Sequence, residues 1–326
     1  MKYDFLSIGG MTEDLVFFTD EGILLDNKDD ILRQKLLAFE YGAKINSQNL
    51  FSYFGGGASN TAVNFAGLGF RVACLANLGK DERAKLIIKN LKDKGIDTSL
   101  ISFDQKKSSG FSFIVNNKKD RIIFTYRGAN DSLVISSRQA AIIKKAEWTY
   151  LSSLPLKPKS NLEVIFKNKN KIAWNPSLSQ LSKGFSFLAS FLKNTDIFIV
   201  NKDEALEIIT KSQGFSHFTN DFLNRPRNLV KILKEQGPDK IILTDGTKGA
   251  YFFDGSNFHH QGIIKNQNRV DSTGVGDAFA STVVATLFKY QGDYKKAMYL
   301  GVKNVASMIS QPGAQNGLLK LKDLIK

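Results

Sequence analysis

Residues 271–279 read Asp-Ser-Thr-Gly-Val-Gly-Asp-Ala-Phe, and a long apolar run follows them. Two glycines around one residue at the start of a helical run leave backbone N–H groups bare, and the helix dipole adds partial positive charge there. The stretch therefore predicts an anion site, suited to phosphate, at Gly274, Val275 and Gly276. Asp277 lies in the first helical turn. It either complements the dipole or acts as the base for a hydroxyl that attacks the phosphate.

A second glycine-rich stretch lies near the N-terminus, where residues 55–64 read Gly-Gly-Gly-Ala-Ser-Asn-Thr-Ala-Val-Asn. Three glycines before a helix let a ligand approach the backbone closely. Asn60 is a polar side chain in the first turn of an otherwise small and apolar helix. It could face a ligand, or Ser59 or Asn60 could merely cap the helix. The stretch is a second candidate binding segment.

Short apolar stretches alternate with amphipathic ones along most of the chain. Strands are expected at residues 3–8, 72–78, 148–152, 172–174, 197–200 and 240–244, and helices at 58–67, 81–94, 160–167, 185–193, 202–211 and 228–236. The alternation predicts a mostly parallel sheet covered on both faces, in one domain spanning residues 1–326. Ligands of open parallel sheets bind at the carboxyl ends of the strands. Gly9-Gly10, Asn201, Thr244–Gly246 and the segment before Gly274 are therefore expected to converge.

Two regions break this alternation. Residues 14–53 are long and irregular, with an acidic middle at residues 26–30. Residues 109–115 and 121–126 flank a polar turn, which indicates a hairpin. We expect these pieces to form a small β-structure outside the main sheet, a lid made of segments near 14–53 and 107–127.

The composition excludes several classes of protein. The 326 residues include 45 Lys+Arg and 31 Asp+Glu, a formal net charge of +14, and 42% are hydrophobic. The hydrophobic share is ordinary for a soluble globular chain. The single cysteine, Cys74, excludes an intrachain disulfide and a cysteine zinc site.

The sequence also bears on location and on large partners. The N-terminus lacks the long apolar segment of a signal peptide, and no run approaches the ~18 apolar residues of a membrane span. We therefore expect a cytoplasmic protein with no membrane partner. Because the lysines are scattered, a solvated basic surface that attracts anionic substrates is favoured over a nucleic-acid site.

The two glycine-rich segments resemble the signatures of the PfkB, or ribokinase-like, family of carbohydrate kinases. Residues 271–279 are similar to its C-terminal Asp-Thr-x-Gly-x-Gly-Asp-x-Phe motif, and residues 55–64 to its N-terminal Gly-Gly…Asn motif. The resemblance covers essentially the whole chain. It implies a three-layer α/β/α sandwich with a mostly parallel central sheet and a small β lid, and an ATP-dependent phosphotransferase with an alcohol acceptor. No Gly-x-x-x-x-Gly-Lys-Ser/Thr motif occurs, so a P-loop kinase is excluded.

The resemblance also implies roles for individual residues. Asp277 would accept the proton of the attacking hydroxyl, and the N–H groups of Gly274, Val275 and Gly276 would stabilise the transferring phosphoryl group. The implied substrate-binding residues are Asp14, Thr12, Gly56, Gly57, Asn60 and Arg127, with Asp14 and Asn60 holding sugar hydroxyls.

The nucleotide side is implied in the same way. Asn201-Lys202-Asp203-Glu204 resembles the family's Asn-x-x-Glu motif linked to Mg²⁺ and phosphate, reached largely through water. Glu204 could also be the capping-box partner of Asn201. The implied nucleotide-binding residues are Asn201, Glu204, Thr244, Gly246, Gly249 and Asn304, and Asp271 would serve a monovalent cation such as K⁺.

One departure from the family bears on the substrate. Gly57 stands where ribokinases and phosphosugar kinases of the family commonly carry Lys, which argues against a phosphofructokinase-type substrate. The leading hypothesis is therefore a kinase of a free sugar such as ribose, fructose or a keto-deoxy sugar acid.

Two alternatives stay open. A nucleoside kinase of the same family would need an apolar wall for the base, which Phe51, Tyr53, Phe111 and Phe113 could supply. A non-catalytic nucleotide or sugar sensor is the second alternative, and the intact glycines and Asp277 argue against it. Pairing of the lid strands into a homodimer is implied by the resemblance.

Overall fold

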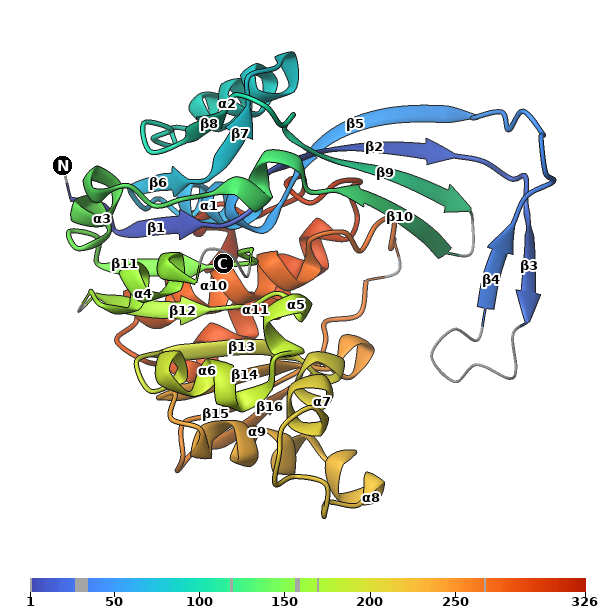
Figure 1. Ribbon diagram of the computed structural model, residues 1–326. Helices are drawn as coiled ribbons and strands as arrows, with labels where there is room; N and C mark the ends of the chain where they lie inside the picture. Colours follow the sequence, from blue (N-terminus) through green and yellow to red (C-terminus); the bar gives the residue numbers. More distant parts are fainter. Residues whose placement is uncertain (1, 27–34, 118–119, 156–158, 169, 267) are drawn as a thin grey trace.

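The computed structural model describes residues 2–26, 35–117, 120–155, 159–168, 170–266 and 268–326. Its centre is an eight-stranded sheet (Figure 1). In chain order the strands are β1 (Phe5–Ile8), β6 (Val72–Leu75), β11 (Trp148–Leu151), β12 (Lys171–Trp174), β13 (Ile197–Asn201), β14 (Lys240–Thr244), β15 (Ala250–Phe253) and β16 (Phe258–Gln261). The order across the sheet is β16-β15-β14-β13-β12-β11-β1-β6. The strands from β14 to β6 are all parallel, and the β15–β16 hairpin adds an antiparallel edge.

Helices cover both faces of this sheet. One layer contains α1 (Gly57–Gly67), α2 (Glu82–Asp93), α10 (Val275–Lys289), α11 (Tyr294–Met308) and α12 (Leu321–Leu324). The other contains α3 (Ser137–Ile143), α4 (Ser160–Phe166), α5 (Leu178–Leu181), α6 (Gly184–Leu192), α7 (Lys202–Thr210), α8 (Asn220–Leu223) and α9 (Pro226–Glu235). This is the three-layer α/β/α sandwich that was predicted, and that prediction is confirmed.

The sheet separates two apolar cores because side chains alternate along each strand. In β1, Phe5 belongs to the core under α1 and α10, while Leu6 and Ile8 belong to the core on the other face. Phe5 stacks on Phe65 of α1 with ring centroids 4.1 Å apart. Strands buried on both faces read as continuous apolar runs, which is why the sequence located them.

A second sheet lies beyond the carboxyl ends of these strands (Figure 1). It contains β2 (Thr12–Phe18), β5 (Asn49–Gly55), β9 (Gly110–Asn117) and β10 (Asp120–Tyr126), in the order β10-β9-β2-β5. The hairpin predicted at 109–126 is β9–β10, and residues 118–119 of its turn lie outside the described residues. The lid pieces thus form a small β-structure outside the main sheet.

Residues 14–53, which were expected to be long and irregular but to join the small β-structure, are more regular than expected over the residues the structure describes there. They contain most of β2, the hairpin of β3 (Ile23–Asp26) and β4 (Lys35–Ala38), and most of β5. Residues 27–34, which include most of the acidic stretch, lie outside the described residues. The strand β2 is held by pairing to β9, about a hundred positions further along the chain, and such non-local pairing leaves little local signal.

Two smaller observations complete the fold. The strand predicted at 72–78 divides into β6 and β7 (Asn77–Gly79), and β7 pairs with β8 (Ser102–Asp104) in a separate two-stranded sheet. Within the described ranges, none of the helices is long and apolar enough to cross a membrane.

Candidate active site

The start of α10 is built around Gly274. This residue is the N-cap of the helix with φ +75°, and a Cβ at this position would lie 2.5 Å from Cβ of Ala314, so only glycine fits. Gly276 is exposed. A Cβ placed on it would lie more than 4 Å from every described heavy atom outside its chain neighbours and the backbone of its own helix. The first turn of α10 therefore presents open backbone N–H groups, as an anion site requires.

The glycine stretch at the start of α1 lies close to two carboxylates. A Cβ on Gly55 would lie 2.1 Å from Oδ2 of Asp14, and a Cβ on Gly57 would lie 3.7 Å from Oδ1 of Asp277. Gly56 has φ +88°, and its Cβ would lie 2.4 Å from the carbonyl oxygen of Gly10. The backbone of residues 55–57 is thus pressed against the segment after β1, with Asp14 beside Gly55 and Asp277 near Gly57.

Asn60 and Asp277 are in direct contact. Nδ2 of Asn60 donates to Oδ2 of Asp277 over 2.8 Å, although the two residues are 217 positions apart in the chain. Burial raises the pKa of Asp277 above its ordinary value of 3.8, and the hydrogen bond from Asn60 opposes that rise. A carboxylate with a raised pKa is a stronger base, and Oδ1 is not used by Asn60. The capping alternative was wrong, because the N-cap of α1 is Gly56 and no described side chain caps this helix.

Gln315 is a site residue that the sequence did not reveal. Its Nε2 donates to Oγ of Ser59 over 2.7 Å and to Oδ1 of Asn60 over 3.3 Å. With its oxygen held by Gln315, the Asn60 amide directs its nitrogen to Asp277. The only sequence signal is that Gln315 follows the Gly313-Ala314 pair.

Asp14 lies on β2 of the lid with its side chain buried. Burial raises the pKa of its carboxyl group, and the nearby hydroxyls of Ser112 and Thr12 oppose that rise. Among the described residues, Oδ1 of Asp14 has no hydrogen-bond partner. A buried acceptor without a partner is costly unless a ligand supplies a donor, and a sugar hydroxyl is such a donor. The substrate role of Thr12 stays a prediction.

Asn201 and Glu204 form the capping box at the start of α7. The Asn201 side chain accepts from the backbone N–H of Glu204 over 2.8 Å, and Glu204 Oε2 accepts from the backbone N–H of Asn201 over 2.8 Å. Burial raises the pKa of Glu204, and the charges of Asp203 and Asp277 raise it further. Glu204 is therefore within electrostatic reach of Asp277. A carboxylate at this place fits a Mg²⁺ bound mainly through water and phosphate.

The nucleotide side of the site is a pocket of about 700 Å³. The predicted residues Thr244, Gly246 and Gly249 line it together with Val275 and Gly276. The sequence did not reveal the rest of the lining, which includes an apolar wall of Ile263, Ile264, Phe279, Val302, Val305, Ala306 and Ile309 and the cations Lys265 and Arg269. The positions 302, 305, 306 and 309 form one face of a helix by spacing, so the sequence does carry a signal for the wall formed by α11 and its C-cap Ile309.

The prediction that Asn304 binds the nucleotide was wrong, because Asn304 does not line this pocket. It is fully buried, its Nδ2 donates to Oδ1 of Asn64 over 3.0 Å and to Oγ1 of Thr282 over 2.8 Å, and its Oδ1 accepts from the backbone N–H of Leu319. Its side chain thus connects α1, α10 and α11 and is closed to a nucleotide. An asparagine one position from the apolar face of α11 cannot be told from a ligand residue by sequence.

Two other predicted residues are held by protein groups at the edge of the site. Asp271 accepts from the backbone N–H and hydroxyl of Thr273 at Oδ1 and from the backbone N–H of Gly313 at Oδ2. Arg127 is half-exposed, and pairs with Asp131 over 2.6 Å while Nη1 lies 3.4 Å from Oγ of Ser153. The cation role of Asp271 and the substrate role of Arg127 stay predictions.

The four aromatic residues suggested for a base pocket divide between the two faces of the lid sheet. Cross-strand neighbours point to the same face, so Tyr53, paired with Asp14, lies on the Asp14 side, and Phe51 follows it at a spacing of two. Phe111 is paired with Glu13 and lies under the guanidinium of Arg83, with 4.6 Å from Cζ to the ring centroid. Phe113 shares the face of Phe111. The suggestion was therefore wrong for Phe111 and Phe113, which lie on the opposite face from Asp14.

Gly57 gives a stability prediction. A Cβ at this position would lie 2.7 Å from both Cβ and Oγ of Ser152, so we expect Gly57→Ala to lower the free energy of unfolding by about 1–3 kcal/mol through overpacking. Ser152→Gly removes both of those atoms, and the double variant should recover part of the loss. Urea unfolding of the four proteins measures this coupling. Additive losses would contradict the contact.

Known proteins resemble this chain over nearly its whole length. The family model "pfkB family carbohydrate kinase" matches residues 29–321. An ATP-dependent 6-phosphofructokinase of Thermoanaerobacterium thermosaccharolyticum is 24% identical over 314 residues, 91% of this chain and 93% of its own. A ribokinase of Mus musculus is 28% identical over 295 residues, 87% and 86% of the two chains.

A solved structure agrees with the fold. The structure of Arabidopsis thaliana ribokinase complexed with ribose and ATP matches with a TM-score of 0.79 at 17% identity, over 100% of this chain and 98% of that one. Family members are kinases that transfer a phosphoryl group to a hydroxyl. The family model and the paired glycine segments lead to one conclusion: this chain belongs to the pfkB family of carbohydrate kinases.

Proposed function

We propose that this kinase transfers the γ-phosphoryl group of ATP to a hydroxyl of a free, uncharged sugar. The observation that carries the proposal is the contact of Asn60 with Asp277 beside the open N–H groups of residues 274–276. It joins a base, a substrate-side amide and an anion site in one place. The ribokinase relative supports a free sugar as the acceptor.

The reaction is a direct displacement. Asp277 accepts the proton of the sugar hydroxyl as its oxygen bonds to the γ-phosphorus, and the bond to the β-phosphate oxygen breaks with its electron pair leaving on ADP. The N–H groups of Gly274, Val275 and Gly276 stabilise the charge on the transferring group. Mg²⁺ held by Glu204 and Asn201 through water would supply charge neutralisation on the phosphates. Catalysis of this type is mainly positioning and electrostatics.

The charges around the site favour a neutral acceptor. Two carboxylates lie against the glycine stretch, Asp14 beside Gly55 and Asp277 near Gly57, and Ser152 leaves no room at position 57 for the lysine that would bind a sugar phosphate. Arg127, already paired with Asp131, is a cation at the edge of this region. A carboxylate or phosphate on the sugar would meet net repulsion unless Arg127 turned to it.

A nucleoside is the second candidate acceptor. Phe51 and Tyr53 lie on the Asp14 face of the lid with ring centroids 5.9 Å apart and nearly parallel planes. These rings could pack against a base while the ribose met Asp14 and Asn60. The same rings also suit contact with the body, since a Cβ on Gly313 would lie 2.8 Å from the Tyr53 ring.

The test is ADP release with Mg·ATP across free sugars, sugar acids, sugar phosphates and nucleosides. Turnover on a free sugar that is abolished in Asp277→Asn supports the proposal. Turnover confined to nucleosides replaces the acceptor class, and turnover confined to sugar phosphates agrees with the 6-phosphofructokinase relative and overturns the charge argument. No turnover on any of these acceptors, with ATP binding intact, favours a sensor.

Two further expectations have their own tests. Omitting K⁺ from the assay tests the cation role proposed for Asp271, and cell fractionation tests a cytoplasmic location.

We further propose that two copies pair through their lids. The strands β5 and β10 are the free edges of the lid sheet, and Leu50 on β5 and Phe124 on β10 are 59% and 58% exposed. Unpaired edges with apolar side chains favour association. We expect light scattering to give a dimer and Phe124→Asp to shift it to a monomer, with the exposed Phe222→Asp on α8 as the control. A wild-type monomer at high concentration would contradict the pairing.

A further inference from the structure

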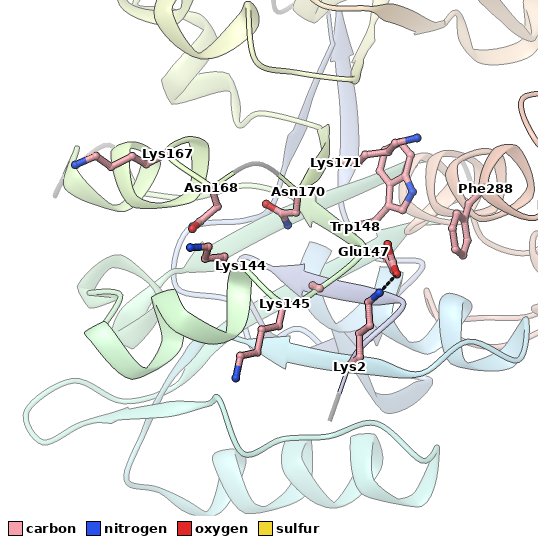
Figure 2. A pocket seen from close by; sticks show the side chains of 11 residues that line it. Lys2, Lys144, Lys145, Glu147, Trp148, Lys167, Asn168, Asn170, Lys171 and Phe288 are labelled. Carbon is pink, nitrogen blue, oxygen red and sulfur yellow. Dashed lines mark ion pairs between the residues drawn. The ribbon is translucent and has the colours of Figure 1, made fainter.

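A second hollow, of about 940 Å³, lies away from the candidate active site. Figure 2 shows its lining, which comes from the amino end of the sheet: Lys2 precedes β1, Trp148 begins β11 and Lys171 begins β12. The strands β1, β11 and β12 are parallel, so their amino ends lie together at one end of the sheet. The site with Asp277 lies at the carboxyl ends of the strands, and the hollow is therefore separate from the site of the proposed reaction.

The hollow is strongly basic. Five lysines line it in the described residues, Lys2, Lys144, Lys145, Lys167 and Lys171, with Glu147 as the single carboxylate. Lys2 pairs with Glu147, which leaves four lysines without an ion-pair partner in the part of the chain that the structure describes. Lys169 lies outside the described residues. Asp196, which directly precedes β13, is within electrostatic range of Lys171.

Helix ends explain only part of this charge. Lys144 and Lys145 follow the C-terminus of α3, and Lys167 follows that of α4, where cations complement the helix dipole. Lys2 and Lys171 lie at strand starts and have no such role. Lys171 also lies over the ring of Trp148, with 5.5 Å from Nζ to the centroid. The side-chain amides of Asn168 and Asn170 add polar groups to the lining, and Oδ1 of Asn170 is buried without a described partner.

We propose that this hollow binds a small molecule with two or more phosphate groups. Its volume suits a ligand of nucleotide size, and several flexible ammonium groups around one concavity suit a compact polyanion better than a long one. Phe288, partly exposed at the rim, provides an apolar surface. The shared chemistry is the phosphate chain, whether it comes from an inorganic polyphosphate or from a nucleotide.

The test is calorimetric titration of the full chain with inorganic tripolyphosphate. We expect two sites, because the nucleotide pocket with Lys265 and Arg269 also attracts the probe. Lys144→Gln with Lys171→Gln should weaken one of them about tenfold, the size expected for two exposed ion pairs, and should leave ATP-dependent turnover unchanged. Lys265→Gln with Arg269→Gln should remove the other. The matched control is Lys89→Gln with Lys92→Gln, two exposed lysines on α2.

The outcomes separate cleanly. A single site that is insensitive to the Lys144/Lys171 pair overturns the proposal, and so does an equal loss in the control pair, which would mean that net charge alone acts. Loss confined to the Lys144/Lys171 pair supports it. Repeating the titration with ATP in the Lys265/Arg269 variant, with and without the Lys144/Lys171 pair of substitutions, then assigns the source: ATP binding that depends on Lys144 and Lys171 and is tighter than that of tripolyphosphate indicates a nucleotide, and equal or weaker binding indicates an inorganic polyphosphate.

Discussion

Replacing Asp277 by Asn lowers kcat by about 10²–10⁴-fold, the contribution of a positioned general base. Asparagine keeps the shape and can still accept from Nδ2 of Asn60, which lies 2.8 Å from the carboxylate, but it cannot take the proton of the hydroxyl. Single-turnover kinetics with Mg·ATP and the best acceptor measure the effect. ATP binding should be nearly unchanged. Asp221→Asn, an exposed acid in the first turn of α8, is the matched control.

The same substitution should not cost stability. Because burial raises the pKa of Asp277 in the folded chain, the folded state binds a proton more tightly than the unfolded state, and stability from this group is lost as the pH rises through the raised pKa. At neutral pH the charged carboxylate therefore opposes folding, and Asp277→Asn should match or exceed the wild type in urea. The difference should shrink as the pH falls below the ordinary aspartate pKa. A variant that is inactive and also unfolded would not support the base.

The pH dependence of the wild type follows from the same pKa. Activity requires the ionised carboxylate, so kcat should fall on the acid side at a pH above the ordinary aspartate value of 3.8. Asn60→Ala removes the hydrogen bond that opposes the rise, and should move this acid limb to higher pH. If the acid limb of the kcat profile does not move in Asn60→Ala, a group other than Asp277 produces it.

Replacing Asp14 by Ala has the second large effect. Hydrogen bonds to a charged group contribute about 1.5–3 kcal/mol each, so losing two to sugar hydroxyls should lower kcat/KM for the acceptor by about 10²-fold or more. KM for ATP should change little, because Asp14 is on the lid and does not line the nucleotide pocket. Steady-state kinetics with each substrate varied in turn measure the split.

The control for Asp14 is its neighbour on the same strand. Glu13 points to the other face of the lid, where Oε2 lies 2.9 Å from Nε of Arg83 on α2. Glu13→Gln should leave the acceptor KM within about twofold, since the Glu13 side chain lies on the face of the lid opposite to Asp14. An equal rise in KM for both variants would mean that Asp14 acts through the position of the lid rather than through the sugar.

Local sequence determined the parallel fold and the two glycine segments. At Gly274 the local sequence is enough, because a glycine directly before a helix with an acid in its first turn predicts a helix start with accessible backbone N–H groups. Asp277 and Asn60 could be named from the same local patterns. The Asn201–Glu204 pair could be named too, because a capping box is a contact within one turn.

Tertiary structure alone decided which side chains meet. Gln315 reaches Asn60 from 255 positions away, and Asn304 turns into the protein instead of the nucleotide pocket. Phe51 and Phe111 lie on opposite faces of the lid because strand register assigns each side chain to a face. The basic hollow likewise exists only where the starts of distant strands lie together. Local sequence specifies backbone conformation, whereas contacts between distant residues depend on how the finished sheets and helices pack.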